Sequence, residues 1–508
     1  MIRVDAPLGD VTMLRLDGNR IGAQGFIAAR AAIGAALKVG TRAILLDIAK
    51  ASHLRASDIA RLVELAGLAL PVARLSLVNV QPGPMTALRD YALDEVIPIY
   101  ATLTRALEAP EVRSGLLART QAIVLSAGKG SRMAPLTQHC PKPMLDIMGK
   151  PVLEHILGHL ARYGVRDVML NPGHLGPQLP AHFGTGERTG QSLFYLNEGM
   201  ERGGRWVAAP LGSASTLARL VQDHNALMRD TIVMCGDALV NVDLPAMMTA
   251  HRAAHADVTI AALTVRAEEV HKYGIMVTDA GGRVTDFQEK PNVADAKSRL
   301  ANTGIYIVSP RAADKLVARD GADIAGDLLP AILAAGGRVQ AFAKPFDWVD
   351  IGCGREYAAA WAQALAGRLP WLEHDAVELA PGIWAHDTAK VARLTDIEGP
   401  AYLGPDVDIA RGASLRGPAV IGAGSVVEAG AFIRNSVLMP QTRAAAGALV
   451  DGMIAGPRWA VAHAYADGSE QPWDPVEGLS PLGNAAAAVG VPDGVTHLSP
   501  PATLARAS

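Results

Sequence analysis

The sequence predicts an α/β protein built from three consecutive folded parts. Apolar, β-favouring runs alternate with helical segments from the start of the chain to about residue 370, a pattern typical of α/β domains. One buried strand, 122–125, ends in a glycine-rich loop that is followed by basic side chains. Further along, aliphatic residues recur at every sixth position. A chain of 508 residues has room for three parts of about 150 residues each.

The overall composition narrows the class of protein. The net charge of −3 argues against a general nucleic-acid binder, which usually carries a basic face. Three well-separated cysteines (Cys140, Cys235 and Cys353) fit buried thiols in a reducing compartment. The first residues lack the pattern of a signal peptide, and no uncharged apolar run reaches about 18 residues. We therefore expect a cytoplasmic protein without a membrane span.

Residues 1–112 predict a small α/β domain. The expected strands are 11–16, 41–47 and 75–80, and the expected helices are 25–39, 56–68 and 91–107. The strand 43–47 (AILLD) and the closing segment 88–106 resemble those of STAS domains, the type found in anti-sigma-factor antagonists. This resemblance implies a module that binds a protein partner or regulates the enzyme, without a catalytic residue of its own.

The phosphorylation turn of STAS domains is altered in this sequence. The position of the usual phosphoserine is Ala56, and the Asp before it is Arg55. The phospho-switch is therefore not expected to operate. Ser57 remains, and we expect its hydroxyl to cap a helix that begins at Asp58.

The segment 121–151 combines a buried strand, a glycine loop and basic side chains. The loop 126–131 (SAGKGS) offers bare backbone N–H groups, which can cradle phosphate oxygens because Gly permits close approach and positive φ. Arg132 and Lys142 supply the positive charge that a polyphosphate needs. Such a loop can also be a simple tight turn, but the two basic residues favour a phosphate site. Its spacing fits neither the Walker loop nor the dinucleotide pattern.

Two acidic residues follow strands at distant points of the chain. Asp237 comes directly after the apolar strand 231–235, and Asp350 lies in the segment 346–352 (FDWVDIG). Ligands of open α/β sheets bind at the carboxyl ends of strands. Either residue alone could merely cap a helix, such as the one expected at 241–254. Two carboxylates together with phosphate oxygens would form a Mg²⁺ site, because Mg²⁺ takes few protein ligands.

These motifs, in this order, resemble the signature of sugar-1-phosphate nucleotidyltransferases (NDP-sugar pyrophosphorylases). The matching segments are GKGSRM, PLT and PKP within 128–143, PLGSA at 210–214, YGI at 273–275, EKP at 289–291 and NTGIY at 302–306. A free Glu–Lys pair on a surface would be the alternative reading of 289–290. The resemblance implies a Rossmann-like catalytic domain over 120–370, which joins a nucleoside triphosphate to a sugar 1-phosphate.

The same resemblance assigns roles to individual residues. The catalytic residues are Arg132, Lys142, Asp237 and Asp350, and the last two also bind Mg²⁺. The nucleotide-binding residues are Ala127, Gly128, Gly130, Ser131 and Gly212. The residues that bind the sugar phosphate are Gly274, Glu289, Lys290 and Asn302.

The order of motifs, joined to the hexad repeat, looks most like that of mannose-1-phosphate guanylyltransferases, so GTP and mannose 1-phosphate are the expected substrates. Thymidylyl- and uridylyltransferases for glucose 1-phosphate carry nearly the same motifs. Two other functions stay open. The chain could be a catalytically weakened regulatory or scaffold subunit, or a nucleotide sensor that signals through the STAS-like domain.

A period of six dominates the third part of the chain. Nine aliphatic positions are spaced six residues apart: Val391, Ile397, Leu403, Ile409, Leu415, Ile421, Val427, Ile433 and Met439. This ladder resembles the left-handed parallel β-helix of hexapeptide-repeat proteins, expected over 376–456 with a loss of register near Ala445. The resemblance implies a homo-oligomer assembled through the β-helix. Residues 466–508 are rich in Pro, Gly, Ala and Ser and predict a flexible tail.

Overall fold

The computed structural model describes residues 2–5, 8–19, 21–316, 319, 321–393, 395–463, 479–481 and 496–498. The chain forms two compact units. The first comprises Met1–Ala122, Leu160–Asp167 and Leu244–Ala254, and the second comprises Ile123–His159, Val168–Asp243 and His255–Ser508. None of the helices in the described ranges combines the length and the apolarity needed to cross a membrane.

The first unit contains a five-stranded sheet with helices between its strands, as the alternating pattern predicts. The strands are β1 (Ile2–Val4), β2 (Val11–Leu16), β3 (Ala43–Asp47), β4 (Arg74–Val78) and β5 (Ile99–Tyr100), in that spatial order. The helices are α1 (Ala23–Lys38), α2 (Ala56–Ala69), α3 (Pro82–Asp90), α4 (Leu103–Glu108) and α5 (Pro110–Arg113). Strands β2 to β5 pair in parallel, and β1 pairs antiparallel with β2.

Two expectations for the first unit are wrong. The continuous helix expected at 91–107 is broken into a 3₁₀ turn (Leu93–Glu95), the short strand β5 and α4, because Pro98 interrupts a helix and Ile99 pairs with Leu77 instead. Ser57 does not cap its helix either. The helix begins at Ala56, one residue before Ser57, and the carboxylate of Asp58 accepts a hydrogen bond from the backbone N–H of Arg55 at 3.1 Å.

The second unit contains a large mixed sheet. Its strands are β6 (Gln121–Leu125), β9 (Asp167–Leu170), β10 (Ser192–Leu196), β13 (Thr231–Cys235), β15 (Val258–Thr264), β16 (Gly274–Thr278), β17 (Val284–Glu289), β18 (Leu300–Val308) and β19 (Val339–Phe342). The order β17-β16-β18-β13-β6-β9-β10-β35 places β6 inside the sheet, with β35 (Thr496–Leu498) parallel to β10, and β15 pairs with β18 and β19. The helices of this part of the chain are α6 (Val152–Arg162), α7 (Gln178–Phe183), α8 (Ser213–His224), α9 (Leu244–Ala253), α10 (Leu329–Ala334) and α11 (Gly354–Leu365).

Small strand pairs lie outside the large sheet. They are β7 (Asp146–Ile147) with β8 (Lys150–Pro151), β11 (Gly199–Arg202) with β12 (Arg205–Ala208), and β14 (Ala238–Val240) with β20 (Trp348–Asp350). The β11–β12 hairpin was not expected from the sequence.

The carboxyl ends of three neighbouring strands meet at one edge of the sheet. The backbone N–H of Gly236, just after β13, donates to the carbonyl oxygen of Leu125 at the end of β6, at 2.8 Å. The backbone N–H of Ser126, just after β6, donates at 2.6 Å to the side chain of Asn171, which follows β9. The segments that follow these strands are therefore close together at this edge. Open α/β sheets bind ligands at such an edge.

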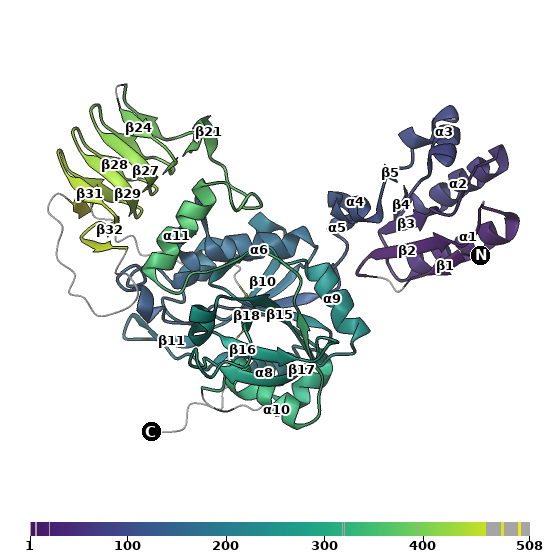
Figure 1. Cartoon of the computed structure of the whole chain (residues 1–508), viewed down its shortest axis with the longest axis horizontal. Helices are drawn as coiled ribbons and strands as arrows, with labels where there is room; N and C mark the ends of the chain where they lie inside the picture. The colour runs from purple at the N-terminus through teal and green to yellow at the C-terminus, as the bar shows by residue number, and fades with distance from the viewer. Residues whose placement is uncertain are drawn as a thin grey trace. The chain divides into compact units, whose positions relative to one another are not determined.

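Parallel strands stack regularly in the last part of the chain, as Figure 1 shows. These strands are β21 (Val377–Ala380), β22 (Ile383–Ala385), β23 (Lys390–Val391), β24 (Asp396–Glu398), β25 (Ala401–Leu403), β26 (Asp408–Ile409), β27 (Ser414–Ile421), β28 (Val426–Val427), β29 (Phe432–Leu438), β30 (Thr442–Ala444), β31 (Leu449–Asp451), β32 (Met453–Gly456) and β33 (Trp459–Ala462). Partners in the first coils are 18 residues apart, as in Leu403 with Ile421. The strands fit a parallel β-helix, with an antiparallel strand at each end of the stack.

Most of the aliphatic ladder is buried, but Val391 at its start is 39% exposed and Ile397 is only partly buried. Leu403, Ile409, Leu415, Ile421, Val427 and Ile433 all lie in the core of the stack. The next coil has one residue fewer, so Ile421 pairs with Leu438 and not with Met439. The sequence predicts a change of register near Ala445, and in the structure the change occurs a few residues earlier, by Leu438. Within the expected tail, the structure describes β34 (Leu479–Pro481) and β35 (Thr496–Leu498), and Trp473 lies outside the described residues.

Ile433→Ala is expected to lower the free energy of unfolding by about 2–5 kcal/mol, because the truncation leaves a cavity in a core where Ile433 is 0% exposed. Chemical denaturation of the full chain measures this loss. Leu449→Ala provides the control, since Leu449 belongs to the neighbouring strand β31 but is 65% exposed. Equal destabilisation by both substitutions would contradict the burial of the ladder.

Candidate functional site

The loop after β6 forms an open backbone cradle. Gly130 has φ +60°, and a Cβ at this position would lie 3.1 Å from side-chain atoms of both Lys142 and Thr137. The hydroxyl of Thr137 donates to the carbonyl oxygen of Gly130 at 2.9 Å, which fixes the loop from the other side. Gly128 is exposed, and nothing lies within 4 Å of a Cβ placed on it. The backbone around Gly128 is therefore accessible to a ligand, and Gly130 is required by conformation and space.

Ala127 and Ser131 flank these glycines in different ways. Ala127 is buried, and its carbonyl oxygen lies only 2.4 Å from the position of a Cβ on Gly173, so the loop packs closely on the segment after β9. Ser131 is exposed and opens a short 3₁₀ helix, Ser131–Met133. The Nε2–H group of His174 donates to the carbonyl oxygen of Thr137, 2.8 Å away, and so ties the segment after β9 to the loop.

Lys142 and two distant carboxylates form the centre of the candidate site. The Nζ atom of Lys142 lies 2.6 Å from Oδ2 of Asp237. Strands β14 and β20 pair antiparallel, and Asp350 is the register partner of Ala238, the residue after Asp237. This pairing brings together two carboxylates that are far apart in the sequence. Lys142 lies between Pro141 and Pro143, whose fixed φ angles favour the short 3₁₀ helix Lys142–Met144.

The charges in this centre influence one another. Burial and the nearby carboxylate of Asp237 raise the pKa of Asp350 to about 6. Burial alone would lower the pKa of Lys142, but the carboxylates of Asp237 and Asp350 raise it above its ordinary value. Lys142 therefore stays protonated and partly neutralises two carboxylates that repel each other. Within the described ranges, no group of three or more His, Cys, Asp or Glu side chains is gathered for a metal.

Arg132 lies on the rim of this centre. Its side chain is exposed, and its Nη2 atom lies 3.8 Å from the position of a Cβ on Gly352. The same position is 3.6 Å from Oδ2 of Asp350 and 2.8 Å from Oε2 of Glu356. Gly352 thus leaves open the space between the guanidinium and the two carboxylates. The four residues with an expected catalytic role, Arg132, Lys142, Asp237 and Asp350, are brought together by the fold.

The four expected sugar-phosphate residues lie on β16, β17, β18 and just beyond β17. Gly274 is the register partner of Glu289, and a Cβ on Gly274 would lie 3.0 Å from Oε2 of Glu289. Lys290 has φ +46°, and its Nζ atom is 3.3 Å from Glu289 Oε1. Both side chains are exposed, so this ion pair contributes little to stability and remains free to bind a ligand.

Asn302 is fixed by its neighbours on β18. Its side-chain oxygen accepts from the backbone N–H of Gly304 at 2.9 Å, and its amide nitrogen donates to the Tyr306 hydroxyl at 2.8 Å. The amide is therefore held in one orientation, with one N–H left to point elsewhere. No direct hydrogen bond between Asn302 and Glu289 or Lys290 is found in the described part of the chain.

Glu356 connects the carboxylate centre to the segment expected to bind the sugar phosphate, and no sequence motif identifies this residue. Its Oε2 atom accepts from the backbone N–H of Gly352 at 2.8 Å, and its Oε1 atom accepts from Lys272 Nζ at 2.9 Å. The rings of Tyr273 and Trp348 also meet, with centroids 5.0 Å apart.

Gly212 lies in a turn that begins α8. It has φ +95°, and a Cβ there would lie 2.5 Å from the carbonyl oxygen of Ala322. The hydroxyl of Ser213 does not face the site: it donates to Asp323 at 2.9 Å and accepts from the backbone N–H of Ile324 at 2.8 Å. The turn is therefore held from behind by the segment that precedes α10.

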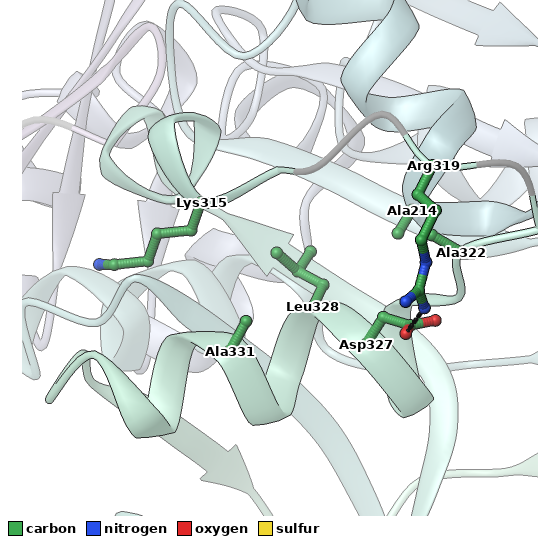
Figure 2. Close-up of a pocket in the computed structure, with 7 residues that line it drawn as sticks. All are labelled: Ala214, Lys315, Arg319, Ala322, Asp327, Leu328 and Ala331. Carbon is green, nitrogen blue, oxygen red and sulfur yellow. Dashed lines mark hydrogen bonds and ion pairs between the residues drawn. The ribbon is translucent and has the colours of Figure 1, made fainter.

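A cavity of about 210 Å³ lies behind this turn, next to Ala214. Figure 2 shows Arg319 reaching towards Asp327, with which it forms an ion pair, whereas Lys315 points away from that pair. Small apolar side chains (Ala322, Leu328 and Ala331) line the rest of the cavity. The cavity separates the back of the turn from α10, and none of the expected site residues lines it.

Two further buried polar residues link the segments expected to bind the nucleotide, and the sequence analysis did not identify them. Asn171 follows β9, and Glu198 lies between β10 and the hairpin β11–β12. Asn171 Nδ2 donates to Glu198 Oε1 at 2.9 Å. Polar residues directly after strand ends were the available signal, but the sequence does not show which of them meet.

Comparison with known proteins places the chain among enzymes. Residues 121–366 match the family model described as Nucleotidyl transferase. The chain is 37% identical over 339 residues to a UTP--glucose-1-phosphate uridylyltransferase of Synechocystis sp., covering 66% of this chain and 87% of that protein.

Two further relatives differ in the base and the sugar that their names give. A mannose-1-phosphate guanylyltransferase of Mycobacterium tuberculosis is 30% identical over 294 residues, which are 56% of this chain and 77% of that protein. A glucose-1-phosphate adenylyltransferase of Desulfitobacterium hafniense is 29% identical over 262 residues, which are 48% of this chain and 64% of that protein.

Proposed function

Because the chain belongs to the nucleotidyl transferase family, we propose that it transfers a nucleotidyl group from a nucleoside triphosphate to a sugar 1-phosphate. The observation that carries this proposal is the convergence of Lys142, Asp237 and Asp350 beside an open glycine loop. Triphosphate chemistry needs such a combination of backbone donors, a lysine and carboxylates. The intact centre also argues against a catalytically weakened scaffold.

In the proposed reaction, a phosphate oxygen of the sugar 1-phosphate attacks the α-phosphorus of the triphosphate. A new P–O bond forms, the bond from the α-phosphorus to the bridging oxygen breaks, and pyrophosphate leaves with that electron pair. The nucleophile is already an anion, so the protein needs no strong general base. Positioning and neutralisation of charge supply the catalysis.

The chain's own residues provide both the positioning and the neutralisation of charge. Backbone N–H groups around Gly128 and Gly130 hold the triphosphate. Arg132 neutralises charge on the α-phosphate and on the leaving group, and Lys142 binds phosphate from the other side. Ala127 and Ser131 complete the loop, and Gly212 approaches the base and ribose.

Residues on β16 to β18 bind the acceptor. Glu289 accepts hydrogen bonds from sugar hydroxyl groups, and the ammonium of Lys290 binds the sugar phosphate. The free N–H of Asn302 donates to the sugar, and Gly274 lets the Phe287 ring and Glu289 pack against its backbone, because a Cβ there would lie 2.4 Å from the ring and 3.0 Å from the Glu289 carboxylate.

We also propose that Mg²⁺ binds to Asp237 and Asp350. The two carboxylates fit this ion: they lie on paired strand ends, and their mutual repulsion contributes to the raised pKa of Asp350. Bound Mg²⁺ would orient the phosphate oxygens and act as a Lewis acid. Lys142 meanwhile keeps one carboxylate oxygen of Asp237 in place.

UTP and glucose 1-phosphate are the first candidate substrates, because the uridylyltransferase relative has the higher identity and coverage. GTP and mannose 1-phosphate are the second candidate pair. They are favoured by the order of motifs in the sequence and by the guanylyltransferase relative at 30% identity.

The outer domains have proposed roles of their own. The first unit is a STAS-like module that binds a protein partner, supported by its alternating strands and helices and by the β2-β3-β4-β5 parallel order. The last part is a left-handed β-helix of hexapeptide repeats that assembles a homo-oligomer. Three free cysteines support a cytoplasmic location.

Measuring pyrophosphate release by the full chain, over a grid of UTP, GTP, ATP and dTTP against glucose and mannose 1-phosphates, tests the proposal. We expect one triphosphate and one sugar phosphate to exceed all other pairs by roughly 10²-fold in kcat/KM, because a site built to hydrogen-bond a substrate rejects an analogue that leaves buried groups unpaired. Absence of release with every pair would overturn the catalytic proposal and favour a scaffold or a nucleotide sensor.

A further inference from the structure

We propose that Glu198 and Asn171 are positioning residues for nucleotidyl transfer. They do not contact substrate but hold the loop after β6 and the turn before α8 in a fixed relation. This inference rests on the proposed function, because those two segments are the ones assigned to the nucleotide. It adds a requirement to the site that none of the sequence motifs contains.

Asn171 joins the network to the loop that receives the triphosphate. Its side-chain oxygen accepts from the backbone N–H of Ser126 at 2.6 Å, and Ser126 is the first residue after β6. Its amide nitrogen donates to Glu198 Oε1 at 2.9 Å. Asn171 is only 3% exposed, so both ends of the amide are committed inside the protein.

Glu198 joins the network to the turn at Gly212. Its Oε2 atom accepts from the backbone N–H of Leu211 at 2.8 Å, and its Oε1 atom accepts from the hydroxyl of Thr216 in the first turns of α8. Its backbone is also fixed, through the carbonyl oxygen of Pro172 and the backbone N–H of Ala209, both at 2.8 Å. One carboxylate therefore connects the segment after β9 to both sides of Gly212.

A buried carboxylate at Glu198 lowers the stability of the fold, so stability alone does not explain its presence. The side chain is 2% exposed, and among the described residues its partners are the neutral donors of Asn171, Leu211 and Thr216, with no basic side chain paired to it. Burying an ionised carboxylate without a cation costs several kcal/mol that well-packed apolar side chains would avoid.

A carboxylate nevertheless suits this position because it only accepts hydrogen bonds. Three donors converge on its two oxygens, and a Gln amide would turn an N–H₂ group towards at least one of them. Such a mismatch would move Leu211 or Asn171, and with it one of the two nucleotide-binding segments. The geometry thus explains why a charge is retained where stability alone does not require it.

The test is Glu198→Gln in the full chain, with KM and kcat measured separately for each substrate. We expect the KM for the triphosphate to rise roughly 10- to 100-fold, because a mismatched hydrogen bond to a buried charged group has that effect. The KM for the sugar 1-phosphate should change less than about 3-fold, since its residues lie on β16 to β18. Glu198→Asp, which keeps the charge, should recover part of the affinity.

Asp257→Asn is the matched control. Asp257 is another buried carboxylate that accepts from a backbone N–H, that of Arg338 at 2.8 Å, but it is paired with Arg311 and Lys315 and bonds to neither of the proposed nucleotide-binding segments. It should lower the thermal midpoint without changing the KM for the triphosphate. If Glu198→Gln leaves that KM unchanged, or raises both KM values together as the thermal midpoint falls, the positioning role is wrong.

Direct binding separates this inference from the proposed function. Calorimetry with α,β-methylene UTP and α,β-methylene GTP measures nucleotide affinity without turnover. Weaker binding to Glu198→Gln than to the wild type supports the positioning role even if no sugar phosphate is used. Equal binding of an analogue to both proteins overturns it, and failure of turnover with every substrate pair overturns only the proposed function.

Discussion

Asp237→Asn is expected to lower kcat/KM for nucleotidyl transfer roughly 10³-fold, because the Mg²⁺ ion that we propose at this position would supply several kcal/mol of stabilisation to the transition state. The substitution keeps the shape of the side chain but removes one of the two charges that face the metal position. We also expect the Mg²⁺ concentration for half-maximal activity to rise at least about 10-fold. Pyrophosphate release measured over a Mg²⁺ titration gives both quantities.

The matched control for this prediction is Asp47→Asn. Asp47 also ends a buried strand, β3, and its carboxylate accepts from the backbone N–H of Ala49 at 2.9 Å, but it belongs to the first unit. It should leave the Mg²⁺ dependence unchanged. The double variant Asp237→Asn/Asp350→Asn should be little worse than Asp237→Asn, because the two carboxylates act as one unit. Normal turnover and Mg²⁺ dependence in Asp237→Asn would exclude a metal role for this carboxylate.

Lys142→Met is expected to reduce kcat/KM roughly 10²- to 10³-fold, because it removes a preorganised positive charge from a partly buried site. For the Mg²⁺ requirement, we expect the opposite of the change predicted for Asp237→Asn. Without the ammonium, which lies 2.6 Å from Asp237, the two carboxylates attract a cation more strongly, and half-maximal activity should need less Mg²⁺. The same Mg²⁺ titration therefore distinguishes loss of Lys142 from loss of Asp237.

Lys50→Met is the control for a lysine–carboxylate pair. Its Nζ atom lies 2.8 Å from Asp17, a similar distance, but both side chains are largely exposed and belong to the first unit. Removal of an exposed pair should change stability by less than about 1 kcal/mol and leave turnover unaltered. If Lys142→Met raises the Mg²⁺ requirement, the proposed balance of charges at the centre is incorrect.

Local patterns in the sequence identified most elements and the separate parts of the site. The strand 231–235 and the helix at 56–68 were found because burial period and propensity act over a few residues. Gly130 could be recognised because a positive φ is a local demand that Gly meets. The prediction of a continuous helix at 91–107 is wrong because Pro98 and the pairing of Ile99 with β4 outweigh the helical period.

Residues whose role depends on long-range contacts could not be found in this way. Asn171, Glu198 and Glu356 each meet partners from segments that are remote along the chain. A single Asn or Glu after a strand has many possible partners, and nothing local selects among them. One coil has 17 residues, so Leu438 and not Met439 pairs with Ile421. This shift likewise results from stacking on the previous coil.

The sequence alone determined the α/β alternation, the glycine loop, the aliphatic ladder and the identity of the charged residues at strand ends, because each is a short-range property of the chain. The tertiary structure decided that Lys142 faces Asp237, that Asp350 joins them through the pairing of β14 with β20, and that a buried carboxylate at Glu198 links the loop after β6 to the turn before α8. These contacts arise only when strands distant in sequence are hydrogen-bonded side by side, which sets the distances between their side chains.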